Sequence, residues 1–225
     1  MNEKKAMPFC GVKVKICGIT TMEEAGFLNE AGADYAGFVF YEKSRRNLGL
    51  SEAKDIAKTL TGGILKAAVT VSPDLDFVRE IEALGFDLLQ VHGTLTQDVR
   101  EHARIPIWRA VNITDEKKLE YFFEEERAAG MEYISGYVAD GAGYGGGKPF
   151  DWEGLSKSVR ESLDAIRQNR GIQLILAGGL TEENVAQGIR CFEPDIVDVS
   201  SGVEENGKKS RIKIENFIRK VRQHG

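Results

Sequence analysis

The sequence has 225 residues, of which 42% are hydrophobic, and 30 Lys and Arg against 35 Asp and Glu give a formal net charge of −5. This composition excludes a disordered chain and is sufficient for a full hydrophobic core. The acidic balance argues against a nucleic-acid-binding domain and against a polybasic membrane-surface protein. We therefore expect neither nucleic acid nor a membrane as a partner.

The cysteines and the N-terminus indicate where the protein is found. The three cysteines, Cys10, Cys17 and Cys191, are too few and too scattered for a disulfide framework or a zinc site, and an odd number is typical of a reducing compartment. No apolar stretch reaches the roughly 18 residues that span a bilayer, and the N-terminus lacks the apolar region of a secretory signal. We expect a cytoplasmic protein in which residues 1–10 are an N-terminal extension.

Short β-branched and apolar runs alternate along the chain with segments of helical period. Strands are expected, in chain order, at residues 12–17, 34–40, 64–71, 86–91, 105–111, 132–139, 172–177 and 195–200. The first helix begins after Thr21, a suitable N-cap residue. The helices that follow the other strands are expected at residues 51–60, 73–84, 96–103, 115–128, 152–168, 181–191 and 211–223.

Eight strand–helix units of this kind predict an α/β fold, a (β/α)8 TIM barrel that forms a single domain, for which roughly 250 residues is typical. An open doubly wound sheet is the alternative, but it usually has fewer strands, and no Gly-x-Gly-x-x-Gly follows the first strand. In a barrel, the reacting groups lie at the C-terminal ends of the strands.

Reactive residue types occupy those expected strand ends. Cys17 ends the first strand, His92 follows the fourth and Asp140 follows the sixth. Because strand residues alternate between two faces, Lys15 shares a face with Cys17, and Asp198 shares one with Ser200. If these faces and that of Arg109 point into the barrel, then Lys15, Arg109 and Asp198 form an internal polar network, which must be paired to be tolerated.

Glycine-containing turns follow the seventh and eighth strands. Gly178 and Gly179 follow the seventh, and Ser201 and Gly202 follow the eighth, with residues 202–204 as a possible short extra helix. Glycine allows close approach of the backbone to an anion, and backbone amides then point at it. These turns predict a phosphate site of the kind that barrels carry after strands seven and eight.

Each candidate also has an ordinary structural interpretation. Cys17 could be a small buried hydrophobe, Asp140 a turn former, Arg46 a solvated residue and His92 a histidine with its hydrogen bonds satisfied. The acidic run at residues 124–126, together with Lys208 and Lys209, is expected to be solvated.

Several segments match a known family, in the family's order, from about residue 12 to the C-terminus. They include KICGIT at residues 15–20, GFVFY at 37–41, KSRR at 43–46, QVHG at 90–93, GKPFDW at 147–152, LAGGL at 176–180 and VDVSSGVE at 197–204. The chain resembles phosphoribosylanthranilate isomerase of tryptophan biosynthesis. The resemblance implies an Amadori rearrangement of N-(5-phosphoribosyl)anthranilate to 1-(2-carboxyphenylamino)-1-deoxyribulose 5-phosphate, without a metal ion or organic cofactor.

The resemblance also implies the roles of individual residues. Cys17 matches the family's general base and Asp140 its general acid. The thiolate is the competent form of Cys17, so it needs a cationic neighbour, for which Lys15 is a candidate, and the acid needs a raised pKa. Arg46 matches the residue that binds the anthranilate carboxylate. The remaining predicted substrate-binding residues are His92, Asp198, Gly178, Gly179, Ser200, Ser201 and Gly202.

Two other functions stay open. One is a related barrel isomerase that acts on another aminoaldose phosphate, such as the histidine-pathway intermediate. That family carries two aspartates at the comparable positions, so Cys17 counts against it. The other is a non-catalytic barrel that binds phosphosugars, against which the presence of both Cys17 and Asp140 argues. The sequence leaves open whether the protein is a monomer or a homodimer.

Overall fold

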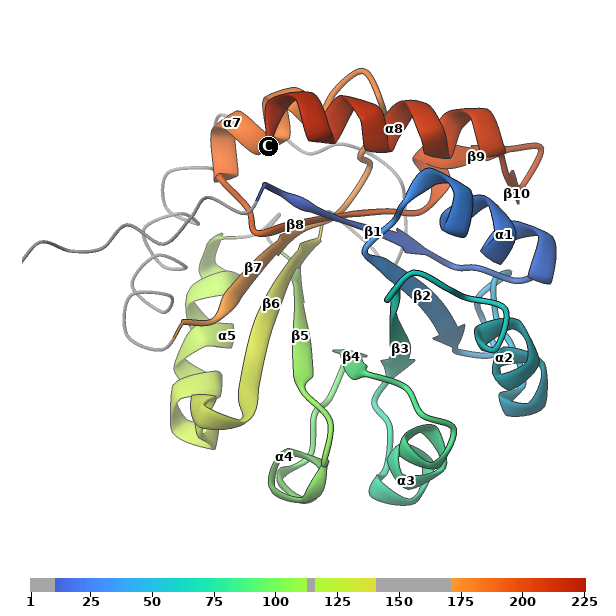
Figure 1. Ribbon diagram of the computed structural model, residues 1–225. Helices are drawn as coiled ribbons and strands as arrows, with labels where there is room; N and C mark the ends of the chain where they lie inside the picture. Colours follow the sequence, from blue (N-terminus) through green and yellow to red (C-terminus); the bar gives the residue numbers. More distant parts are fainter. Residues whose placement is uncertain (1–10, 113–115, 141–170) are drawn as a thin grey trace, which may run out of the picture.

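The computed structural model describes residues 11–112, 116–140 and 171–225. Within them, eight parallel strands hydrogen-bond in sequence order and close into a barrel, with the last strand paired to the first. Helices surround the strands (Figure 1), so the predicted (β/α)8 architecture is confirmed. Residues 1–10, the glycine-rich loop after Asp140 and the helix expected at 152–168 lie outside the described residues.

The barrel strands begin and end within a few residues of the expected limits. They are β1 (Lys13–Cys17), β2 (Tyr35–Phe40), β3 (Leu65–Val71), β4 (Leu88–His92), β5 (Ile107–Asn112), β6 (Ile134–Asp140), β7 (Gln173–Leu176) and β8 (Ile196–Val199). A short hairpin of β9 (Glu204–Glu205) and β10 (Lys208–Lys209) follows β8, and neither of these strands was expected from the sequence.

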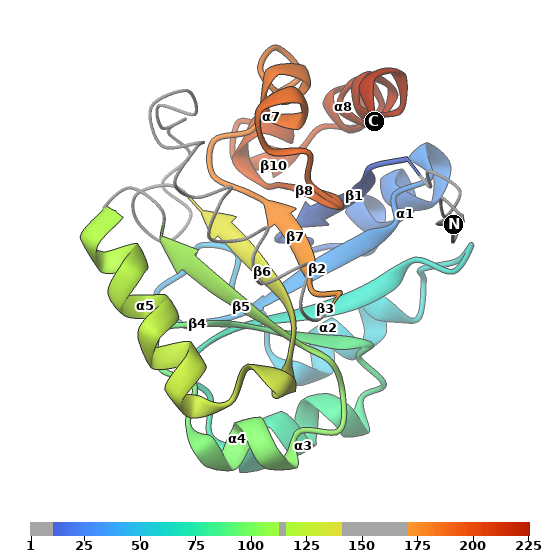
Figure 2. The same ribbon diagram turned by 90° about the vertical axis from the view of Figure 1, so that its left-hand side faces the viewer.

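The helices lie where helical periodicity was expected. They are α1 (Met22–Ala31), α2 (Leu50–Ala57), α3 (Leu75–Ala83), α4 (Gln97–His102), α5 (Glu116–Ala129), α7 (Val185–Phe192) and α8 (Arg211–His224), with 3-10 turns η1 (Met131–Tyr133) and η2 (Ser201–Val203). The side chain of Thr21 accepts a hydrogen bond from the Glu24 amide, as predicted for an N-cap. Figure 2 shows α7 and α8 side by side on one side of the barrel.

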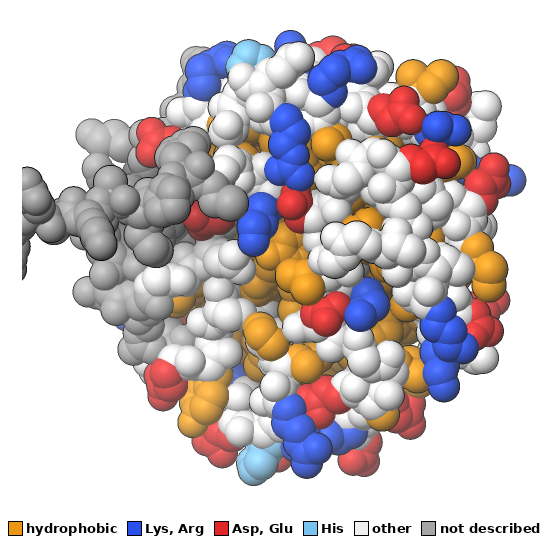
Figure 3. All heavy atoms as spheres, viewed as in Figure 1, with side chains coloured by type: hydrophobic (Ala, Val, Ile, Leu, Met, Phe, Trp, Pro, Cys, Tyr) orange, Lys and Arg blue, Asp and Glu red, His pale blue; other side chains and the backbone are white. Residues whose placement is uncertain are grey.

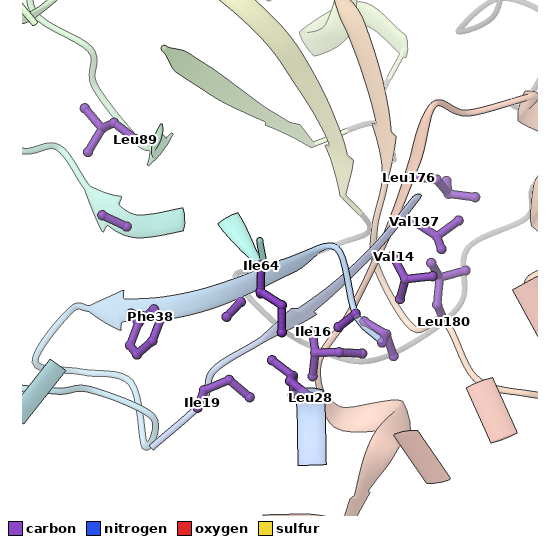
Figure 4. Close-up of a cluster of buried hydrophobic side chains, with 14 of the residues drawn as sticks. Val14, Ile16, Ile19, Leu28, Phe38, Ile64, Leu89, Leu176, Leu180 and Val197 are labelled. Carbon is purple, nitrogen blue, oxygen red and sulfur yellow. The ribbon is translucent and has the colours of Figure 1, made fainter. Parts of the chain in front are cut away.

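Two hydrophobic layers result from the alternation of strand residues. The larger layer lies between the barrel and its helices, where Val14 and Ile16 of β1 pack with Leu28 of α1 and Val197 of β8 (Figure 4). The smaller one is formed by residues of the barrel interior, including Tyr35 and Trp108, whose ring centroids are 5.2 Å apart. The interior is therefore a packed core below the strand ends.

The prediction that Lys15, Arg109 and Asp198 form one internal polar network is wrong for Arg109. Lys15 and Asp198 form an ion pair, but Arg109 belongs to a separate cluster with Glu126 of α5. Because Trp108 occupies the interior face of β5, its neighbour Arg109 must point to the other face. Glu126, expected to be solvated, is buried because it also pairs with Arg100. The alternation of strand residues predicts which side chains share a face, but not which of the two faces points into the barrel.

Charged side chains of both signs are scattered over the face seen in Figure 3, and neither sign dominates a single region of it. Among the residues that the structure describes, no helix is both long enough and apolar enough to cross a membrane.

Candidate active site

A cavity of about 440 Å³ opens at the C-terminal ends of the strands. It brings together nearly all the predicted site residues, which come from six of the eight strand ends. Those that line it are Cys17, Arg46, His92, Asp140, Gly178, Gly179, Asp198, Ser200 and Ser201. Gly202 does not line the cavity and lies directly after Ser201. The predicted candidates thus share one site, although their separation along the sequence does not by itself bring them together.

Lys15 does not line the cavity itself, but it pairs with Asp198, which does. Its ammonium lies 2.6 Å from Asp198 Oδ2, both side chains are buried, and the two residues are neighbours across the β1–β8 closure of the barrel. Gly37 of β2 makes room for this arrangement, because a Cβ there would lie 3.0 Å from Cys17 Sγ and 3.2 Å from Lys15 Cε. The lysine therefore lies beside the thiol, as the shared face predicts.

The charges of this cluster act on one another. Burial opposes the charged form of Lys15, but the Asp198 carboxylate and Cys17 keep the pKa of the amine above its ordinary value. Burial raises the pKa of the Cys17 thiol, and the nearby cations Lys15 and Lys209 offset only part of that rise. Lys15 thus favours the thiolate without being sufficient to form it. In the absence of a further positive charge, Cys17 is a thiol.

Asp198 has a free acceptor beside the cavity. Its Oδ2 is occupied by Lys15, whereas its buried Oδ1 has no hydrogen-bond partner among the described residues. A buried acceptor without a hydrogen bond destabilises the protein, and a ligand hydroxyl that donates to Oδ1 would remove this penalty. The geometry agrees with a residue that holds a sugar hydroxyl.

Arg46 lies on the loop after β2 and is held by Glu204. Its Nε lies 2.7 Å from Glu204 Oε1, and the same carboxylate binds Arg45 and Lys209, whose Nζ is 2.9 Å from Oε1. Lys209 was expected to be solvated, and this is wrong: it is buried because its ammonium also donates to the Ser200 carbonyl at 3.0 Å. The Ser200 hydroxyl in turn donates to the Cys17 carbonyl at 2.9 Å.

Glu204 and Lys209 were not among the predicted site residues. Both lie on the β9–β10 hairpin, which turns at Asn206 and Gly207 with φ of 50° and 81°. An Asn-Gly pair with positive φ at both positions is the preferred two-residue hairpin turn. That dipeptide could have revealed the hairpin, and the alternation within it would have separated buried Lys209 from exposed Lys208.

The two glycine turns after β7 and β8 face the same side of the cavity. Gly178 and Gly179 have φ of 86° and 69°, in the left-handed region that favours glycine. Their amides donate to no acceptor within residues 11–112, 116–140 and 171–225. Residues 201–203 form the 3-10 turn η2, in agreement with the expected short helix. Backbone amides converging here are suited to a phosphate.

Asp140 ends β6, is half-buried, and lies opposite Asn112 in the strand register. His92 ends β4, and one of its ring nitrogens, Nε2, is 3.0 Å from Nε2 of the buried Gln90. Both residues line the cavity on strands that are separated from β1 around the barrel. Cys17 and Asp140 therefore face a ligand from different sides.

A model of the N-(5'-phosphoribosyl)anthranilate (PRA) isomerase family matches residues 14–220. The N-(5'-phosphoribosyl)anthranilate isomerase of Caldanaerobacter subterraneus is 38% identical over 217 residues, which cover 94% of this chain and 98% of that protein. The chain belongs to the phosphoribosylanthranilate isomerase family.

Solved structures with this family name have the same fold. The phosphoribosyl anthranilate isomerase of Thermotoga maritima is 32% identical, with a TM-score of 0.79 over 94% of this chain and 99% of that one. A second family structure, in complex with reduced 1-(o-carboxyphenylamino)-1-deoxyribulose 5-phosphate, is 30% identical, with a TM-score of 0.76 and the same two coverages. In this family, then, a solved relative holds a phosphosugar derivative of a carboxyphenyl amine.

Replacing Lys15 of this family member by methionine should lower its stability. The substitution leaves the Asp198 carboxylate buried without its counterion, so we expect the free energy of unfolding to fall by about 3 kcal/mol near neutral pH. The deficit should shrink as the pH falls, because protonated Asp198 carries no charge. Urea unfolding measures it, with Lys13→Met on the same face of β1 as the control. Equal losses in the two variants would contradict the assignment.

Replacing Gly202 by alanine should weaken phosphate binding. A Cβ at this position would overlap the carbonyl oxygen of Leu180, so η2 must move away from the glycine turn after β7. We expect the KM of the phosphorylated substrate to rise about tenfold, since losing one hydrogen bond to a charged group costs about 1.5 kcal/mol. Steady-state kinetics test this. Gly26→Ala in α1 is the control, since a Cβ there meets no atom within 4 Å and the residue has no positive φ.

His92 should stay neutral throughout the physiological pH range. Burial, with the positive charges of Lys15 and Arg109, lowers its pKa to about 4, whereas an unfolded histidine titrates near 6.5. Between these values the unfolded chain takes up a proton that the folded chain does not, so stability should fall as the pH falls from about 6.5 to about 4. An NMR titration, assigned with His92→Asn, would contradict this if the His92 signal moved above pH 6.

Proposed function

We propose that this protein converts N-(5'-phosphoribosyl)anthranilate to 1-(2-carboxyphenylamino)-1-deoxyribulose 5-phosphate in tryptophan biosynthesis. The observation that carries the proposal is the family match over residues 14–220, together with one cavity that collects the family's reactive residues. The rearrangement needs an acid and a base on opposite sides of the sugar.

In the first step, Asp140 donates a proton to the furanose ring oxygen. The C1′–O bond breaks, its electron pair stays on that oxygen, and the amine nitrogen lone pair forms a C1′=N iminium ion. In the second step, Cys17 removes the proton from C2′, and the electrons neutralise the nitrogen to give an enolamine. Tautomerisation of the enolamine gives the ketone.

The order of these steps bears on how Cys17, a half-buried thiol, acts as the base. Burial raises the pKa of Cys17, so the free site holds a thiol. The iminium ion adds a positive charge next to Lys15 and Cys17, and a nearby cation favours the thiolate. Ring opening would therefore create both the acidic C2′ proton and the charge that makes its base competent. Support for this order comes from the Lys15–Cys17–Asp198 cluster.

The other site residues hold the substrate in this proposal. Arg46 pairs with the anthranilate carboxylate. The amides of Gly178, Gly179, Ser201 and Gly202 bind the phosphate, and Asp198 accepts a hydrogen bond from a sugar hydroxyl through Oδ1. His92 and Ser200 complete the wall of the site. We propose a single-domain cytoplasmic enzyme, monomeric or homodimeric, in which residues 1–10 are an extension of the barrel.

A fluorescence assay on the purified protein tests the reaction. Phosphoribosylanthranilate is generated in place from anthranilate and phosphoribosyl pyrophosphate, and its disappearance is followed after a chelator has been added. We expect decay well above the uncatalysed background and unchanged by the chelator. No decay with folded protein would overturn the proposal, and turnover of the histidine-pathway aminoaldose instead would identify the related isomerase.

A further inference from the structure

Glu204 gathers three cations at the edge of the cavity. Its carboxylate accepts from Arg46 Nε at 2.7 Å and from Lys209 Nζ at 2.9 Å, and it also binds Arg45. Burial alone would raise the pKa of Glu204, but the hydrogen bonds from Arg46 and Lys209 hold that pKa below its ordinary value. Glu204 is therefore an anion, and it lies on a hairpin whose two strands, among the described residues, pair only with each other.

The contact with Glu204 determines how the Arg46 guanidinium is turned. The group is planar, so a hydrogen bond at Nε sets the direction of its two terminal nitrogens. Those nitrogens have no acceptor in the described part of the chain, and Arg46 lines the cavity. The stem of Arg46 crosses Gly18, where any Cβ would overlap Arg46 Cδ, so the side chain is confined on that side too.

The charge balance leaves room for an anionic ligand. One carboxylate, Glu204, is surrounded by Arg45, Arg46 and Lys209, which leaves two positive charges uncompensated within the cluster. Lys209 does not bind the ligand directly, because its ammonium already donates hydrogen bonds to Ser200 and Glu204. Arg45 and Arg46 both contact Glu204 and both line the cavity, but the Arg45 side chain is 58% exposed, whereas that of Arg46 is only 14% exposed. Arg46 is therefore the cation that the cluster holds away from solvent at the cavity.

We propose that Glu204 is a positioning residue that fixes Arg46 for end-on recognition of the carboxylate on the substrate's aromatic amine. This inference rests on the proposed function and goes beyond it by assigning selectivity for the ortho carboxylate to a residue that does not touch the substrate. Lys209 supports the same arrangement by joining Glu204 to Ser200 and hence to the Cys17 strand end.

Two substrates separate this role from a merely structural one. N-(5'-phosphoribosyl)anthranilate carries the carboxylate, and the corresponding N-(5-phosphoribosyl)aniline, made from aniline and ribose 5-phosphate, lacks it. For Glu204→Gln we expect the KM of the anthranilate compound to rise about tenfold, because a charge-assisted hydrogen bond no longer orients Arg46. Its kcat, and kcat/KM for the aniline compound, should stay within about twofold.

Matched variants complete the experiment. Glu205→Gln, the exposed neighbour on the same hairpin, should alter neither substrate's constants. In an Arg46→Ala background, Glu204→Gln should cost nothing further for the anthranilate compound. Glu204→Asp, which keeps the charge but shortens its reach, should behave like Glu204→Gln and serves if that variant does not fold.

The outcomes are distinct. Equal losses for both substrates, or an additive loss in the Arg46→Ala background, would overturn the positioning role while leaving the isomerase activity established. An unchanged or lower KM for the anthranilate compound in Glu204→Gln would overturn it as well. Absence of turnover by the unaltered protein would instead be a failure of the proposed function.

Discussion

Replacing Cys17 by serine should lower kcat by about 10³-fold, because the alcohol cannot form the anion that removes the C2′ proton. Serine is close in size, so the cavity and the Lys15–Asp198 pair beside it should be preserved. The KM should change by less than about threefold, since the thiol takes part in proton transfer rather than in binding. Single-turnover kinetics with the fluorescent substrate measure the chemical step directly.

Cys191 provides the control for this substitution. It is a half-buried free thiol on α7, away from the cavity lining. Cys191→Ser should keep the full rate, and alkylation of the unaltered protein should stop turnover only when Cys17 is modified. If Cys17→Ser retained more than a tenth of the rate, another group would have to be the base.

Asp140→Asn should also reduce kcat by about 10³-fold, because an amide cannot donate the proton that opens the furanose ring. The two side chains have the same shape, so binding should be little affected. The pH–rate profile should lose the limb that reports a protonated acid, while the limb that reports the base remains. If Asp140 were only a turn former, Asp140→Asn would leave both limbs of the pH–rate profile in place.

A surface variant of the same kind controls for the loss of a carboxylate. Asp76 is exposed on α3, so Asp76→Asn should leave the rate and the pH profile unchanged. A substrate whose ring is already open would bypass the acid step. Recovery of turnover by Asp140→Asn with such a substrate would support the assignment, and the same deficit would contradict it.

The barrel and its reactive end could be predicted from the sequence because both depend on local pattern. Period two in the strands, helical period between them and Thr21 as a cap are short-range features. Cys17, Asp140 and the glycine turns follow from their positions at strand ends. The KICGIT and VDVSSGVE segments supply their roles, which no residue spacing could give.

The remainder depends on contacts that a linear pattern does not contain. Arg109 and Trp108 are adjacent on β5, and only the fit of the indole to the interior decides which of them is inside. Glu126 and Lys209 are charged, so they were expected at the surface, yet both are buried. Glu126 pairs with Arg100, 26 residues away, and Lys209 donates to Ser200, across the turn that follows β8. Pairing of this kind can be seen only after folding.

The layered interior of the barrel affects how the sequence can change over time. Tyr35 and Trp108, which do not line the cavity, form a lower layer of the barrel interior, and the Lys15–Asp198 pair forms an ionic layer next to the cavity. Substitutions in the lower layer act on stability without touching the ligand, whereas those in the ionic layer act on both. Substitutions in the lower layer can therefore raise stability during adaptation or laboratory evolution. The added stability would allow the protein to stay folded when destabilising substitutions at the mouth of the barrel change its substrate.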